Sequence, residues 1–189
     1  MDALTELAIK YKTDKWGKHH FTPFYYDLFR NNSKRRKVKK VLEIGVAEGA
    51  GLFMFRDFFP NATIYGAEID QVRVDKLQGL DRIQVFKCDQ SSKPDLIILF
   101  SEVGFDIDLI IDDGSHKPED QVFTCLSTLL FLKRGAVYVI EDVADESIAD
   151  EIGSELRRDF GAGLNKFSKP EVIKVGKRYD DRLVIIKNG

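Results

Sequence analysis

The sequence predicts an α/β protein built on a seven-stranded, mostly parallel sheet, with helices on both faces and a C-terminal antiparallel hairpin. Two observations predict this fold. Short apolar runs alternate with amphipathic stretches from residue 38 onward, which is typical of parallel strands joined by helices. The last two apolar runs are separated mainly by the polar segment KRYDD, so we expect them to pair as a hairpin.

Seven segments are expected to be strands because each is short, apolar and rich in β-branched residues. They are residues 40–46, 62–70, 82–89, 105–112, 136–143, 171–176 and 182–187. Segments between them have helical spacing; Phe123, Leu126 and Leu130, for example, recur on one helical face.

The chain has 189 residues, which is the size of one ordinary domain. We expect a single domain over residues 1–189, in which residues 1–37 form an N-terminal helical cap and residues 38–189 form the core. Within the cap, Thr22 followed by Pro23 predicts a helix with Thr22 as its N-cap. The basic run 34–40 is expected to be a solvated linker, with a phosphate-binding patch as the alternative.

Composition argues against several classes of protein. The 29 basic and 31 acidic side chains give a net charge of −2, which favours neither nucleic acid nor an anionic membrane. The two cysteines have no zinc-ligand spacing, and the charged N-terminus is unlike a signal peptide. We therefore expect a cytoplasmic protein with no membrane contact.

A glycine loop follows the first expected strand. The segment VLEIGVAEGAG places Glu43 before Gly45, Gly49 and Gly51, and the apolar helix LFMFRDFF follows. Glycines allow sharp turns and a close approach to a ligand, and a helix N-terminus offers free N–H groups. The spacing G-x-x-x-G-x-G differs from the dinucleotide pattern G-x-G-x-x-G.

Polar residues also end the next strands. Glu68 and Asp70 end the second, and Asp89 and Gln90 end the third. Any one acid alone is readily explained as a helix cap. Because ligands of open α/β sheets bind beyond the carboxyl ends of the strands, the set as a whole predicts a ligand site there.

The segment DLIIDDGSH places Asp113 at the end of the fourth strand, and Glu141 and Asp142 end the fifth. If these strands are neighbours, the three carboxylates converge, and like-charge repulsion would protonate one of them without a counter-charge. A hard divalent cation such as Mg²⁺ suits such oxygen ligands. His116, in the following turn, is then placed to act as a general base on a bound hydroxyl.

The glycine loop with Glu43 resembles motif I of the class I S-adenosylmethionine-dependent methyltransferases, which have a Rossmann-like fold. The segments KYKTDKWGKHHFTPFYYDLF, EIGVAEGAG, IDDGSH and YVIEDV, in this order, are similar to the metal-dependent macrolide and rhamnosyl sugar O-methyltransferases, which share the cephalosporin hydroxylase-like fold. The resemblance implies S-adenosyl-L-methionine and Mg²⁺ as cofactors. It implies that Asp113, Glu141 and Asp142 bind the metal and that His116 is the catalytic base.

The same resemblance implies a set of cofactor-binding residues. The loop residues would lie under the methionine and ribose, Glu68 or else Asp70 would bind the ribose hydroxyls, and residues 89 and 90 would contact adenine. Residues of the N-terminal segment could close over the cofactor, although structural capping explains them equally well. The expected cofactor residues are Glu43, Gly45, Gly49, Glu68, Asp89, Gln90, Asp112, Thr13 and Lys15.

The resemblance implies O-methylation of a hydroxyl on a small acceptor, most simply a sugar of a glycosylated natural product. Alternatives are an O-methyltransferase acting on RNA ribose or a small phenol, and a non-catalytic cofactor-binding subunit. Members of the family often carry a further N-terminal domain or a longer lid, so a homo-oligomer could complete the acceptor pocket here. Ala47 replaces a glycine common in motif I, which requires a negative φ at this position.

Overall fold

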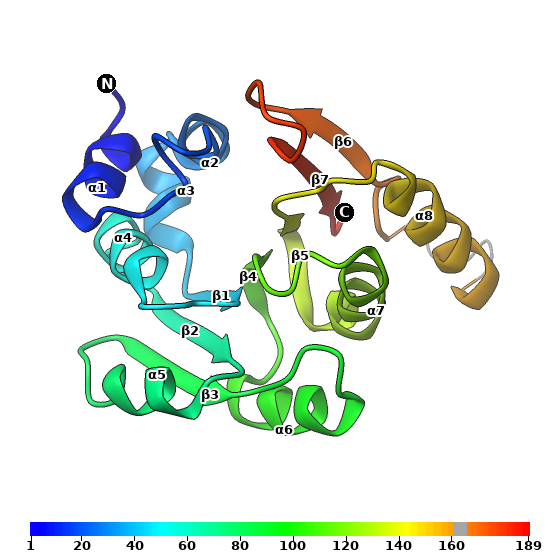
Figure 1. Ribbon diagram of the computed structural model, residues 1–189, viewed down its shortest axis with the longest axis horizontal. Coiled ribbons are helices and arrows are strands. Elements are labelled where there is room, and N and C mark those ends of the chain that lie inside the picture. The colour runs from blue at the N-terminus through cyan, green and yellow to red at the C-terminus, as the bar shows by residue number, and fades with distance from the viewer. Residues whose placement is uncertain (161–165) are drawn as a thin grey trace.

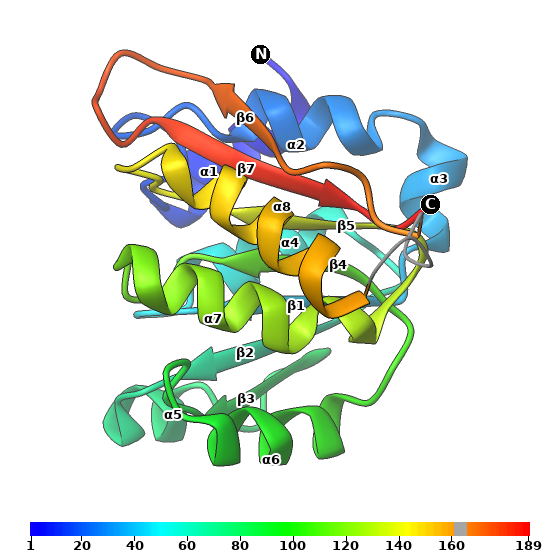
Figure 2. The same cartoon turned by 90° about the vertical axis from the view of Figure 1, so that its right-hand side faces the viewer.

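The fold is known from a computed structural model that describes residues 1–160 and 166–189. Seven strands form one sheet in the order β3-β2-β1-β4-β5-β7-β6. The first five run parallel, β7 is antiparallel to β5, and β6 is antiparallel to β7. Figure 2 shows the reversal, because the arrowhead of β7 points the opposite way to that of β2. The predicted mostly parallel sheet with a C-terminal antiparallel hairpin is confirmed.

The strands lie within a few residues of the predicted segments. They are β1 (Lys40–Ile44), β2 (Thr63–Glu68), β3 (Ile83–Lys87), β4 (Ile107–Asp112), β5 (Leu132–Ile140), β6 (Glu171–Lys174) and β7 (Arg182–Lys187). In β4, Leu109 and Ile111 pack into one apolar cluster while Ile110 packs into the other. This alternation, with both faces apolar, is why the strands read as continuous hydrophobic runs.

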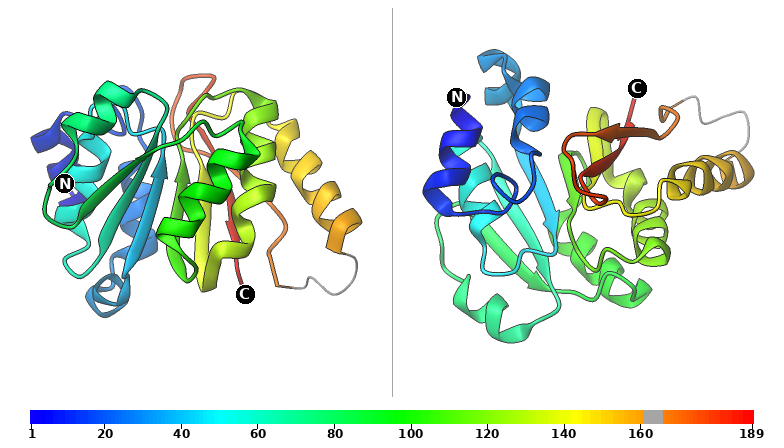
Figure 3. Two further views of the ribbon diagram at one scale, coloured as in Figure 1. Left: turned by 90° about the horizontal axis from the view of Figure 1, so that it is seen from below. Right: turned by 45° about the horizontal axis from the view of Figure 1, so that its top comes forward.

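Helices cover both faces of the sheet (Figures 1 and 3). One face carries α1 (Ala3–Tyr11), α2 (Thr22–Phe29), α4 (Ala50–Phe58) and α5 (Gln71–Lys76), and the other carries α6 (Lys93–Val103), α7 (Pro118–Thr128) and α8 (Ser147–Phe160). A short 3-10 turn, η1 (Leu129–Phe131), leads into β5. Among the described residues, none of the helices has the length and hydropathy that crossing a membrane requires.

The N-terminal cap is held to the core mainly by α1, which packs on α4. The carboxylate of Asp57 on α4 accepts hydrogen bonds from Tyr11 (2.5 Å) and Lys10 (2.9 Å). The prediction that Thr22 is the N-cap of α2 is wrong, because the N-cap is Phe21 and Thr22 is already helical. The Thr22 hydroxyl instead lies 2.7 Å from that of Thr5 and joins α2 to α1.

Most of the basic run is helical, and it forms a mostly exposed connection between α2 and β1. Helix α3 (Asn32–Lys37) contains its first four residues, and the Asn31 side chain accepts a hydrogen bond from the Lys34 N–H (3.1 Å) at its start. The helix has no buried residue and leads into the N-terminal end of β1. Its positive charges therefore lie at the opposite end of the sheet from the carboxyl ends of the parallel strands.

Candidate active site

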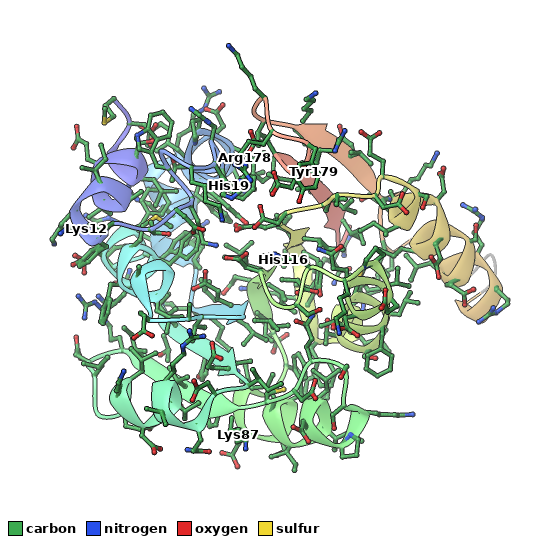
Figure 4. The ribbon with its side chains drawn as sticks, in the orientation of Figure 1. Lys12, His19, Lys87, His116, Arg178 and Tyr179 are labelled. Atoms are coloured by element: carbon green, nitrogen blue, oxygen red, sulfur yellow. The ribbon has the colours of Figure 1, made fainter. Side chains whose placement is uncertain are left out.

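A cavity of about 490 Å³ lies beyond the carboxyl ends of the parallel strands. Its lining includes Gly45, Glu68, Asp89, Gln90, Asp113, His116 and Asp142. These residues follow β1 to β5 in the sheet, as predicted for a ligand site in an open α/β fold. Figure 4 shows His116 near the centre of the molecule, with His19 close by.

The glycine loop is shaped by close backbone approaches. Gly45 has φ +83°, and a Cβ there would overlap the Asp113 carbonyl oxygen, so glycine brings the two turns together. Gly49 (φ +84°) starts α4 and lies against Leu77, outside the lining of the cavity. The expected negative φ at Ala47 is wrong: its φ is +46°.

The side chain of Glu68 is hydrogen-bonded to the backbone of Ala47, the residue with the positive φ. Its Oε2 accepts the Ala47 N–H (2.9 Å) and its Oε1 accepts the Asp70 N–H (3.0 Å), so the acid ties the glycine loop to the end of β2. Glu68 is buried at the wall of the cavity. Asp70, the competing choice for the ribose, caps α5 by accepting the Val72 N–H (2.8 Å).

Gln90 lines the cavity, but its amide holds the turn that carries His116. Its Oε1 accepts the Ser115 N–H (2.6 Å), and its Nε2 donates to Asp112 (3.1 Å) and Thr124 (3.1 Å). Asp112 is buried beneath this turn, and burial raises the pKa of its carboxyl to about 7. The predicted cofactor contact of these two residues stays a prediction, and their side chains also orient the turn.

His116, Asp113 and Asp142 form a compact group, whose ligand atoms all lie within 4.8 Å of one another. His116 Nε2 is 3.2 Å from Asp113 Oδ1 and 3.5 Å from Asp142 Oδ2. The hydrogen bond to Asp113 raises the pKa of His116, while burial lowers it less. The imidazole is 42% exposed, so a ligand in the cavity can reach it.

Lys15, which was expected to contact the cofactor, places a positive charge among the carboxylates of the site. Its ammonium group is buried among three carboxylates, 2.6 Å from Glu141, 2.7 Å from Asp113 and 3.1 Å from Glu43. Burial raises the pKa of Glu43 to about 7, against the lowering effect of Lys15. Burial alone would raise the pKa of Asp113, but Lys15 and His116 hold it below its ordinary value.

Glu141 is fully buried, and both of its oxygens have partners. Oε2 accepts from Lys15, and Oε1 accepts the Tyr25 hydroxyl at 2.5 Å. Tyr25 on α2 is fully buried, and its hydroxyl contributes to this site. All three expected metal ligands have a partner in the N-terminal cap, but Asp113 and Asp142 also face His116, whereas Glu141 lies outside the lining of the cavity.

His19 contacts the same cluster from the N-terminal segment. Its Nδ1 is 2.9 Å from Asp181, in the turn between β6 and β7, and 3.3 Å from Asp142. Because a carboxylate can only accept, we place the proton of this imidazole on Nδ1. His19 therefore links the N-terminal segment, Asp142 and the hairpin turn that carries Arg178 and Tyr179 (Figure 4).

The predicted cofactor residues thus fall into two groups. Gly45, Glu68, Asp89 and Gln90 line the cavity. The others lie outside its lining and have contacts within the protein, and their assignment to the cofactor stays a prediction: Glu43, Gly49, Asp112, Thr13 and Lys15. These residues hold the loops that form the cavity in place through hydrogen bonds, ion pairs or close packing.

The group at His116 suits a hard divalent cation. It offers two carboxylates beside an imidazole, and Asp142 is 5% exposed. Asp142 Oδ1 is buried and lies 3.3 Å from Nδ1 of His19, but that N–H is bonded to Asp181, so the oxygen accepts no hydrogen bond from the residues that the structure describes. A buried carboxylate oxygen without a donor is costly unless a cation or water satisfies it. The residues present therefore fit Mg²⁺ chemically.

No family model matches the sequence. Curated proteins that match include the mycinamicin VI 2''-O-methyltransferase of Micromonospora griseorubida, 38% identical over 150 residues, which are 74% of this chain and 36% of that protein. The 8-demethyl-8-alpha-L-rhamnosyl tetracenomycin-C 2'-O-methyltransferase of Streptomyces olivaceus is 36% identical over 149 residues, 74% of this chain and 37% of that protein. The chain is a relative of sugar O-methyltransferases.

A solved methyltransferase has the same fold. The MycE methyltransferase from the mycinamycin biosynthetic pathway, in complex with Mg, SAH and mycinamycin VI, matches with a TM-score of 0.79 at 27% identity, covering 100% of this chain and 54% of that chain. The predicted fold and the predicted resemblance are both confirmed. The chain spans little more than a third of the length of the curated sugar O-methyltransferases it matches.

Proposed function

We propose that this chain is an S-adenosylmethionine-dependent, Mg²⁺-dependent O-methyltransferase that acts on a sugar hydroxyl of a glycosylated natural product. The observation that carries the proposal is the arrangement in one cavity of Glu68 at one side and His116 with Asp113 and Asp142 at the other. A cofactor site and a proton-accepting site are thereby adjacent. The names of the relatives support the choice of a sugar acceptor.

In this function, Glu68 accepts hydrogen bonds from the ribose hydroxyls, and residues at the end of β3, including Asp89, lie beside the adenine. The methyl carbon leaves the sulfonium sulfur and bonds to the acceptor oxygen, which gives a methyl ether and S-adenosylhomocysteine. The acceptor hydroxyl loses its proton to the imidazole of His116 at Nδ1, because Nε2 faces the carboxylate of Asp113 and carries the proton there. Asp113 and Asp142 are the residues that would hold Mg²⁺ beside His116, with Glu141 next to them. A bound Mg²⁺ lowers the pKa of a coordinated hydroxyl.

RNA ribose is a weaker alternative acceptor. Phosphate binding would be expected near the cavity, because the reacting ribose must reach His116. Helix α3, which contains the basic residues Lys34, Arg35, Arg36 and Lys37, leads into the N-terminal end of β1, away from the cavity. This arrangement favours a small acceptor.

Calorimetric titration with S-adenosylhomocysteine tests the cofactor assignment directly. We expect micromolar binding by the wild type and at least tenfold weaker binding by Glu68→Gln, since a neutral amide accepts more weakly from hydroxyls. Glu102→Gln, an exposed site on α6, is the matched control and should bind normally. Absence of binding by the wild type, or preferential binding of NAD, would refute the proposed function.

A further inference from the structure

Lys15 is the most deeply buried lysine of the described chain, at 2% exposure. Its ammonium group contacts carboxylates that follow or belong to three adjacent strands: Glu43 in β1, Asp113 after β4 and Glu141 after β5. Without the lysine, the three carboxylates would attract a metal ion to the position that its ammonium group occupies. It therefore acts as a fixed monovalent cation inside a site that also suits a divalent one.

The two oxygens of Asp113 separate these cations. Oδ2 lies 2.7 Å from Lys15 Nζ, while Oδ1 lies 3.2 Å from His116 Nε2, on the side that includes Asp142. Lys15 is absent from the lining of the cavity, whereas Asp113, His116 and Asp142 belong to it. The lysine thus neutralises the inner side of the cluster and leaves the cavity side available.

We propose that Lys15 is a positioning residue that confines a divalent cation to the cavity side of the cluster. Its positive charge also lowers the affinity of the cluster for that cation. This inference rests on the proposed function, because it concerns the same metal site. A positive charge a few ångströms from a divalent cation repels it strongly even in a partly screened environment. Removing the lysine leaves three carboxylates without its positive charge. A divalent cation balances their charge more fully than one ammonium group does, so the cluster should bind the cation more tightly.

A substitution at one of the carboxylates should change the cation affinity in the direction opposite to removal of Lys15. Glu43 lies on the inner side of Lys15 and outside the lining of the cavity, and its Oε1 is 3.1 Å from the ammonium group. Glu43→Gln preserves the shape of the side chain and removes the negative charge that the carboxylate carries above its pKa of about 7, so the comparison is made well above that pH. If charge balance sets the metal affinity, this substitution weakens cation binding, whereas Lys15→Met strengthens it.

Free Mn²⁺, followed by its electron paramagnetic resonance signal during titration of the full chain, is the probe. We expect Lys15→Met to bind Mn²⁺ about tenfold more tightly and Glu43→Gln about tenfold more weakly than the wild type. Lys12→Met removes an exposed lysine at the end of α1 and should bind within twofold of the wild type. Turnover of Lys15→Met should fall despite its tighter metal binding, because Asp113 and Glu141 lose their fixed positions.

If Lys15→Met does not fold without metal, Glu43→Gln decides the question, because its amide fits the same space. The inference is overturned if the wild type binds Mn²⁺ and folded Glu43→Gln and Lys15→Met both match its affinity. It is also overturned if Lys15→Met folds and binds Mn²⁺ more weakly. A wild type that binds S-adenosylhomocysteine but no Mn²⁺ would instead refute the metal part of the proposed function.

Discussion

His116 Nε2 lies 3.2 Å from Oδ1 of Asp113, three residues earlier in the same turn. The backbone of His116 has φ +59°, a conformation that is rare for residues other than glycine, and it brings the imidazole back over the carboxylate. The turn thus joins a candidate base to a candidate metal ligand. Such strain at a site is retained where the surrounding structure enforces it.

His116→Asn should lower turnover by about 10² to 10⁴, the usual range for loss of a general base, because the amide cannot accept a proton at neutral pH. S-adenosylhomocysteine affinity should stay within a few-fold of the wild type. Calorimetry and a methyl-transfer assay on the same preparation measure the two effects. His20→Asn, at an exposed histidine, is the control. Equal turnover in His116→Asn and the wild type would remove His116 from the mechanism.

Gly114→Ala should destabilise the turn that carries His116. An added Cβ would overlap the Gln90 amide oxygen, which accepts the Ser115 N–H, and relief of such a clash costs about 1–3 kcal/mol. Turnover should fall more than cofactor affinity. Gly153→Ala in α8 is the control, since its Cβ would meet only ordinary contacts at 3.5 Å. Denaturant unfolding of the two variants gives the comparison, and equal stabilities would show that the turn adapts freely.

Tyr25→Phe should reduce the free energy of unfolding by about 1–3 kcal/mol, because Glu141 loses a buried hydrogen-bond donor at 2.5 Å. Tyr26→Phe, at the next residue on the half-buried side of α2, should change it by less than about 0.5 kcal/mol. Urea titration monitored by circular dichroism suits both variants. A Tyr25→Phe protein as stable as Tyr26→Phe would mean that Glu141 finds another donor.

Much of the fold was predictable from local patterns. Each strand is a short apolar run, and the polar segment before the last run predicted the hairpin of β6 and β7. The ends of these runs placed Asp113, His116 and Asp142 correctly at one edge, because parallel strands end together. Strand periodicity and chain order were sufficient for this part of the site.

The remaining errors concern contacts between segments distant in sequence. Lys15 and Glu141 are 126 residues apart, and only tertiary packing puts the ammonium group where a metal was expected. The need for a counter-charge was inferred correctly, but an internal lysine was not considered as its source. Likewise Ala47 adopts a positive φ because the distant Glu68 accepts its N–H, which overrides the local preference.

Asp57 should make the docking of α1 on α4 sensitive to acid. Burial opposes ionisation of this carboxyl, but hydrogen bonds from Tyr11 and Lys10 outweigh it and lower its pKa to about 2. A depressed pKa stabilises the folded state above the ordinary carboxyl pKa of about 4, and this contribution is lost as the pH falls through 2. Asp57→Asn should be less stable than the wild type at pH 6 and should approach it as the pH decreases.

Thermal unfolding at several pH values measures this difference. Asp27→Asn, at an exposed site that only approaches Arg30 at 3.8 Å, is the control and should follow the wild type throughout. A constant difference between Asp57→Asn and the wild type from pH 6 to the acid limit would argue against the pairing described for α1.

The proposed reaction transfers a methyl group from S-adenosylmethionine to a sugar hydroxyl. The most direct measurement is mass spectrometry of a panel of glycosylated macrolides and rhamnosylated aromatics incubated with the chain, methyl-labelled cofactor and Mg²⁺. We predict a labelled methyl ether on the sugar of at least one acceptor, and its loss on adding EDTA or substituting His116→Asn. Binding of S-adenosylhomocysteine with no labelled product from any acceptor would contradict the claim and indicate a non-catalytic cofactor-binding subunit.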